Sequence, residues 1–192
     1  MTKEKKDMKK NITKLGAMAL VGIMGMGLAT TPVSAAEKTV DVFYTTSSTT
    51  VDADGKIVMT IPTAISLTKN EPSDEFDVEL QTSDPSKYLP SNFKAKVRVK
   101  SANAGKLKKD GTGAAHKYVF KSLDQEITFQ DETTYVDFHD YSVENGTTQG
   151  VVRKATADAT NSVEAMEKEA PGSMFKDTLT FKVESFSGDG LQ

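Results

Sequence analysis

The chain has 192 residues, no Cys and a formal net charge of −3 at pH 7. Without Cys it has no disulfide, no thiolate metal site and no thiol nucleophile. The acidic balance disfavours a nucleic-acid partner, because phosphate binding needs a basic surface.

Residues 1–35 have the pattern of a secretory signal peptide. A basic start precedes an apolar run from Leu15 to Ala29, and the small residues Val33-Ser34-Ala35 suit a cleavage site. This run is shorter than the roughly 20 residues of a membrane span, so we expect cleavage rather than a retained anchor. The leader carries six Lys against Glu4 and Asp7, a net of +4, which leaves about −7 on the remaining residues. We therefore expect one exported domain over residues 36–192, without a membrane span after processing.

The first part of the expected domain alternates between apolar and polar residues, which is typical of strands. Asp54-Gly55 predicts a tight hairpin turn between two such runs. Pro62 marks a bend or an edge, because proline cannot donate to a sheet ladder. The apolar positions of the two runs are Val40, Val42 and Tyr44 before the turn, and Ile57, Met59 and Ile61 after it.

The middle of the chain contains the clearest predicted strand. Its apolar residues Phe93, Ala95, Val97 and Val99 alternate with Lys94, Lys96, Arg98 and Lys100. This pattern predicts a half-buried strand with a basic outward face. Further short strands are expected around Phe76–Leu80, Tyr118–Phe120, Ile127–Phe129 and Tyr135–Val143.

Three features are expected near the C-terminus. Asn145-Gly146 predicts a second hairpin turn before Val151. Asp158–Ala170 shows helical spacing, with Asp158 or Thr160 as the cap. A final strand around Leu179–Val183 precedes a loose tail, residues 187–192. The pattern as a whole predicts an all-β fold, an antiparallel β-sandwich of the Ig-like or Greek-key type with one short helix.

Two segments resemble WxL-type domains, which are secreted β-rich surface proteins of Gram-positive bacteria, and the closing strands of pilin-like β-sandwiches. They are Met59–Leu67 and Gly172–Val183. The chain has no Trp, so Phe181-Lys182-Val183 stands where the W-x-L motif would lie. The resemblance implies export and a β-sandwich, and it does not carry over the attachment of that family to the cell wall.

Charge is segregated along the sequence. Eight basic residues and no acids lie between Lys87 and Lys109, and seven acids without Lys or Arg lie between Asp124 and Glu144. The two blocks either pair across neighbouring strands, the interpretation we favour, or form separate faces. A separate basic face over Lys94, Lys96, Arg98 and Lys100 is a candidate contact for anionic wall polymers such as teichoic acids, and opposite faces would favour self-association.

The residues give no sign of catalysis, and we predict that the chain is not an enzyme and needs no cofactor or metal. Asp137 and His139 would share a strand face, but a metal site needs further ligands. Asp52, Asp54, Asp131 and Glu132 have the residue types of a calcium loop without its expected glutamate. An internal Lys–Asn or Lys–Asp isopeptide bond stays open as well.

These observations predict a secreted, cell-surface-associated structural or adhesive protein that binds wall polymer, a host ligand or another protein. A pilin-like subunit that polymerises by strand exchange is an alternative, with Val40, Val42 and Tyr44 in the donor strand. A secreted hydrolase is the third hypothesis.

Overall fold

Short strands bounded by turns dominate the computed structural model, which describes residues 38–41, 48–53, 55–109, 113–169 and 174–191. All of them belong to one unit, Pro32–Gln192. The expected signal peptide, residues 1–35, lies outside the described residues. None of the described helices has the length and apolar character needed to cross a membrane.

The described chain forms strands that alternate with tight turns, and one short helical segment. The helical segment is η1 (Thr160–Ser162) followed by α1 (Val163–Glu169). The strands are β1 (Lys38–Asp41), β2 (Ser48–Ala53), β3 (Ile57–Pro62), β4 (Ser73–Thr82), β5 (Lys94–Ser101), β6 (Lys106–Lys109), β7 (Ala115–Lys117), β8 (Val119–Ser122), β9 (Gln125–Ile127), β10 (Val136–Ser142), β11 (Gly150–Asp158), β12 (Phe175–Lys176) and β13 (Thr178–Ser187).

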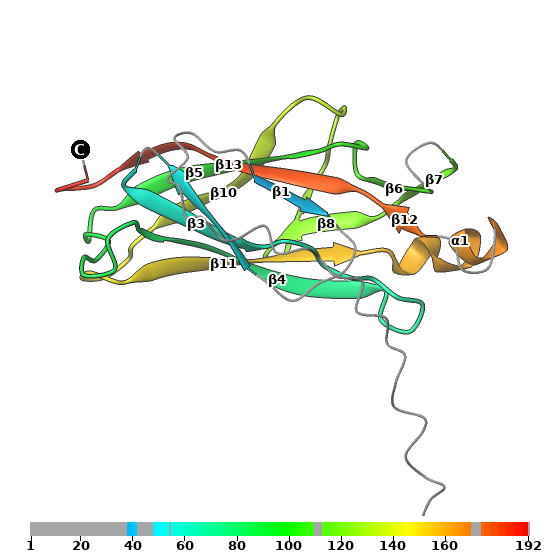
Figure 1. The fold of residues 1–192 in the computed structure, drawn as a ribbon, viewed down its shortest axis with the longest axis horizontal. Coiled ribbons are helices and arrows are strands. Elements are labelled where there is room, and N and C mark those ends of the chain that lie inside the picture. The colour runs from blue at the N-terminus through cyan, green and yellow to red at the C-terminus, as the bar shows by residue number, and fades with distance from the viewer. Residues whose placement is uncertain (1–37, 42–47, 54, 110–112, 170–173, 192) are drawn as a thin grey trace, which may run out of the picture. The chain divides into compact units, whose positions relative to one another are not determined.

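These strands form three antiparallel sheets, as the all-β prediction requires. The four-stranded sheet has the order β1-β13-β5-β10, and the six-stranded sheet has the order β2-β3-β4-β11-β8-β9. A smaller three-stranded sheet has the order β12-β6-β7. Figure 1 shows β13 and β5 in one layer, above β4 and β11 in the other.

The inward faces of the two larger sheets share one apolar core. Phe181 on β13 contacts Phe76 on β4, with ring centroids 6.4 Å apart. Phe138 on β10 lies 6.2 Å from Phe120 on β8. Alternation along each strand places these rings inward, because successive side chains point to opposite faces. Burial of this apolar surface drives the association of the sheets.

The helical segment begins where the sequence predicts it. The side chain of Asp158 accepts a hydrogen bond from the backbone N–H of Thr160, 2.8 Å away. This bond satisfies an amide that has no partner within the helix. It also holds the pKa of Asp158 below its usual value, mainly through hydrogen bonds with Thr160.

Two local predictions are corrected by the structure. Asn145-Gly146 does not close a hairpin, because β10 lies in the four-stranded sheet and β11 lies in the six-stranded sheet. Residues 188–191 do not form a loose tail, since Leu191 is buried against the core and Asp189 donates its N–H to Asn92. In both places the deciding partners are distant in sequence.

Candidate functional site

The basic residues of β5 lie on the outward face of the four-stranded sheet. Val97 and Val99 are fully buried beneath them, as the alternation predicts. Lys94 is exposed, whereas Lys96, Arg98 and Lys100 are half-buried. β5 lies between β13 and β10, so side chains from both neighbours reach this basic row.

Acidic side chains from β10 and β13 pair with the middle of the basic row. Lys96 lies 2.8 Å from Asp137, and the Nε of Arg98 lies 3.2 Å from the same carboxylate. A further ion pair joins Arg98 to Glu184 at 2.8 Å. The hydrogen bond to Asp137 raises the pKa of Lys96. The acidic and basic blocks of the sequence therefore meet across this sheet, and this part of its outward face carries mixed charge.

Tyr135 covers the end of the same face. Its ring lies 4.8 Å from the Nζ of Lys100 and 4.6 Å from that of Lys182. Arg98 donates a hydrogen bond to the Tyr135 carbonyl at 2.5 Å. Cation–π contacts of this kind hold lysine side chains against an aromatic face. No local pattern around Tyr135 indicates this role, because only the pairing of β13 with β5 brings Lys182 next to Lys100.

A β-bulge in β10 separates Asp137 from His139, which sequence alternation places on one face. The register shifts between these residues, so Asp137 is paired with Arg98 and His139 with Val97. Asp137 consequently reaches the outward cations, whereas the Nδ1 of His139 lies 3.2 Å from the Oγ of Ser122. Burial lowers the pKa of His139, with a further contribution from Arg153. The expectation of a shared face is therefore wrong, because a bulge adds one residue to one strand.

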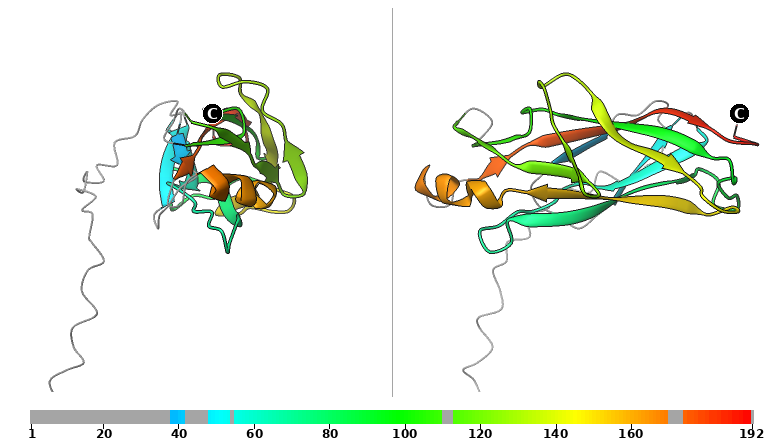
Figure 2. Two further views of the ribbon diagram at one scale, coloured as in Figure 1. Left: turned by 90° about the vertical axis from the view of Figure 1, so that its right-hand side faces the viewer. Right: turned by 180° about the vertical axis from the view of Figure 1, so that it is seen from behind.

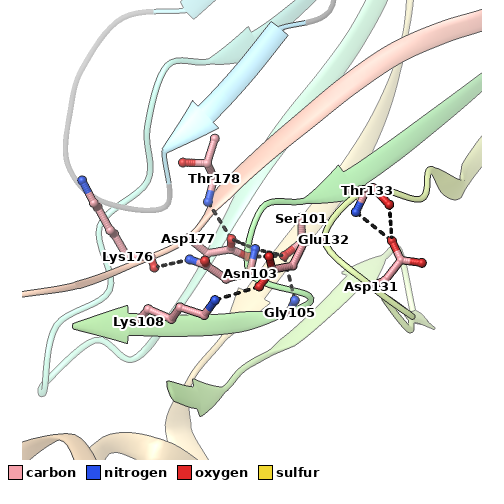
Figure 3. Close-up of polar contacts among 10 residues, drawn as sticks. All are labelled: Ser101, Asn103, Gly105, Lys108, Asp131, Glu132, Thr133, Lys176, Asp177 and Thr178. Atoms are coloured by element: carbon pink, nitrogen blue, oxygen red, sulfur yellow. Dashed lines mark hydrogen bonds and ion pairs between the residues drawn. The ribbon is translucent and has the colours of Figure 1, made fainter. Parts of the chain in front are cut away.

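A buried carboxylate ties the three-stranded sheet to β13 (Figure 3). The Oδ2 of Asp177 accepts a hydrogen bond from Ser101 at 2.5 Å. It also accepts one from the hydroxyl group of Tyr118 at 2.8 Å. Its Oδ1 accepts the backbone N–H groups of Asn103 and Thr178, at 2.9 and 2.7 Å. Asp177 is fully buried, and this burial raises the pKa of its carboxyl group.

The turn beside this carboxylate depends on a glycine. Gly105 has a φ of 72°, and its N–H donates to the Oγ of Ser101 at 2.7 Å. A Cβ at this position would also lie 3.1 Å from the ring of Phe129. The four donors to Asp177 thus connect the end of β5, the start of β13 and the segment around Tyr118. The donors to this buried acid are two backbone amides and two hydroxyl groups.

Asp131 and Glu132, two of the candidate metal-binding residues, have other partners. Asp131 accepts hydrogen bonds from the backbone and hydroxyl groups of Thr133 and Thr134, which lower the pKa of its carboxyl group. Glu132 lies 2.7 Å from Lys108. Asp54 lies outside the described residues, as do the side chains of Asp52. Among the side chains that the structure describes, no three His, Asp or Glu converge as a metal site would require.

The second histidine, His116, is held by an acid and an aromatic ring. Its Nε2 lies 2.8 Å from Glu169 at the end of α1, and its ring centroid lies 5.3 Å from that of Phe175. These contacts join α1 to the three-stranded sheet. The residues are far apart in sequence, and no local signal points to their contact.

The predicted donor-strand segment is described only in part. Val40 lies in β1, which pairs antiparallel with β13 of its own chain and places Val40 opposite Leu179. Val42 and Tyr44 lie outside the described residues. The described residues of β1 pair with Thr178–Phe181 of β13.

No protein-family model matches this sequence, and no curated protein matches it either. The resemblance to WxL-type and pilin-like domains therefore stays a hypothesis.

Proposed function

We propose that this chain is a secreted, cell-surface-associated, non-catalytic β-sandwich of the Ig-like or Greek-key type that holds a wall polymer, a host ligand or another protein. One observation carries the proposal: two antiparallel sheets share a single apolar core and turn their charged side chains outward. Such an architecture presents sheet faces, strand edges and loops to a partner. The leader pattern in residues 1–35 supports export.

The surroundings of the histidines support a binding role over hydrolysis. Ser122 is the hydroxyl partner of His139, and its side chain is almost fully buried, with 2% of the residue exposed. A serine nucleophile must reach a substrate, so this pair is poorly placed for acyl transfer. The contact of His116 with Glu169 joins two elements of the fold.

Cell fractionation combined with wall binding tests the proposal. We expect the chain in the medium or the surface fraction, in a form shortened at the leader. The purified chain is expected to sediment with isolated cell walls, and salt is expected to release it if the contact is electrostatic. A chain found wholly in the cytoplasm, or one that binds neither isolated walls nor surface ligands, contradicts the proposal.

A pilin-like subunit is a second candidate, favoured by the place of β1 in the fold. β1 lies at the edge of the four-stranded sheet and pairs there with β13. An edge strand is the kind of element that another copy of the chain can replace by strand addition.

A further inference from the structure

Four lysines gather on one face of the three-stranded sheet, although they come from three separate parts of the sequence. Leu107, His116 and Phe175 lie on the opposite face, where Leu107 is buried and the rings of His116 and Phe175 are in contact. Strand alternation therefore turns the neighbours of these residues outward. The outward residues, here called the lysine face, are Lys106, Lys108, Lys117 and Lys176.

The pairing register places these lysines directly opposite each other. Lys176 is the partner of Lys108 across β12 and β6, and Lys106 is the partner of Lys117 across β6 and β7. Like charges in such positions destabilise a sheet, so the arrangement does not serve folding. Opposed cations are expected where a protein surface contacts an anion.

Only part of this charge is neutralised within the described chain. Lys108 is paired with Glu132 at 2.7 Å, while the side chain of Lys176 extends away from that contact (Figure 3). Among the described residues, no acid forms a salt bridge with Lys106, Lys117 or Lys176, and the last two are exposed. The lysine face thus differs from the outward face of β5, where Asp137 and Glu184 balance Lys96 and Arg98.

We propose that the lysine face binds a linear polymer whose repeating units carry phosphate. Lysine ammonium groups act as compact point charges toward phosphate. Lysines two residues apart on a strand are spaced by about 6.6 Å, which lets successive phosphates of a flexible chain meet successive ammonium groups. The expected net charge outside the leader is about −7, so a narrow polymer fits this small basic area better than a broad anionic surface.

This inference rests on the proposed function. It assigns the polymer contact to the lysine face in place of the outward face of β5. Figures 1 and 2 place the three-stranded sheet beside α1, at the end of the fold away from the C-terminus. A polymer bound there leaves the outward faces of both larger sheets accessible. The same chain can then hold the wall at one end and present its sheets to another partner.

The test compares two double variants with equal loss of charge. Lys117→Gln with Lys176→Gln removes the two exposed cations of the lysine face. Lys56→Gln with Lys94→Gln is the control, because these residues lie outside that face and Lys94 belongs to the basic row of β5. Binding to inorganic polyphosphate and to isolated cell walls is measured at low and high salt, with polyglutamate as a second anionic polymer.

We expect the lysine-face variant to bind polyphosphate about 25-fold more weakly than the unmodified chain, since each of the two removed basic residues contributes on the order of fivefold in affinity near an anionic surface. The salt dependence of its binding should also be shallower. The control variant should bind like the unmodified chain. Unfolding midpoints should not fall in the lysine-face variant, because removing opposed like charges does not weaken the sheet.

Each other outcome contradicts a defined part of the proposal. Equal loss in both double variants shows a dependence on net charge and overturns the lysine face as a site. Wall binding that survives in the lysine-face variant overturns the inference and leaves the proposed function intact. Tighter binding to polyglutamate overturns the choice of phosphate. An unmodified chain that binds neither walls nor polyphosphate overturns the inference and the wall-binding role together.

Discussion

At the scale of single residues, the fully buried Asp177 accepts four hydrogen bonds. Two backbone amides donate to its Oδ1, and two hydroxyl groups donate to its Oδ2. Amides are fixed by the chain, whereas the hydroxyls of Ser101 and Tyr118 can rotate and accept instead. Loss of the oxygen that accepts from the two amides should therefore destabilise the fold more than loss of the oxygen that accepts from the two hydroxyl groups.

Asp177→Ala should destabilise the fold much more than Asp177→Asn. Alanine leaves both amides without an acceptor, and each buried unsatisfied group costs about 1–3 kcal/mol. Asparagine keeps one oxygen for the amides and offers its NH₂ group to the two hydroxyls. We expect a loss of about 3 kcal/mol or more for Ala in urea unfolding, and a clearly smaller loss for Asn. Equal losses would show that the amides find other acceptors.

The pH dependence of stability should also report on Asp177. Burial raises its folded pKa above the unfolded value, so the folded chain takes up the proton first as the pH falls. The contribution of this residue to the free energy of unfolding therefore increases on acidification through the folded pKa and decreases as the pH rises. Relative to Asp177→Asn, the unmodified chain should gain stability as the pH falls from neutral toward the ordinary pKa of an aspartate side chain. A constant difference between the two unfolding series would contradict the raised pKa.

At the scale of elements, the edge formed by β1 is the feature with a functional consequence. β1 contributes four residues to its pairing with β13, and without β1 the backbone of Thr178–Phe181 has an open edge. Open edges pair readily with other strands. The pilin-like hypothesis therefore depends on whether β1 of one chain can pair with β13 of another.

A chain that begins at residue 42 should bind a synthetic peptide of residues 36–47. The peptide would restore the ladder of β1 with β13, where Val40 lies opposite Leu179. The control peptide carries Pro at both Thr39 and Val40, so that whichever N–H faces β13 is removed. Fluorescence anisotropy measures both peptides. Equal binding of the two, or binding of neither, counts against strand exchange at this edge.

At the scale of the whole molecule, stability depends on rings that connect the two larger sheets. Phe120 on β8 contacts Phe76 in its own sheet, and it contacts Phe138 and Phe181 in the other sheet. It is nearly fully buried, at 1% exposure. One residue therefore joins both halves of the core.

Phe120→Ala should cost about 3–5 kcal/mol, because it removes a large buried ring and leaves a cavity. The unfolding transition should stay single when followed by circular dichroism and by tyrosine fluorescence. Phe129→Ala is a matched control, since Phe129 is only partly buried and packs at the edge of the core. Two separate transitions in the Phe120 variant would show that the sheets unfold independently.

The sequence by itself determined the class of fold, because period-two alternation specifies which side of each strand is buried. The strands around Met59, Val78, Val97 and Phe181 were predictable for this local reason. The order of the strands was not predictable in this way. Phe181 lies on β13 and Val97 on β5, and nothing in the local sequence around either residue indicates that these two strands are neighbours.

The tertiary structure alone decided which charges meet. The bulge in β10 turns His139 away from Asp137, and the pairing of β13 with β5 brings Glu184 to Arg98. Lys117 and Lys176 join Lys106 and Lys108 only because β6, β7 and β12 pair. Register and sheet order depend on contacts between residues far apart in the chain, and a local pattern carries no information about such partners.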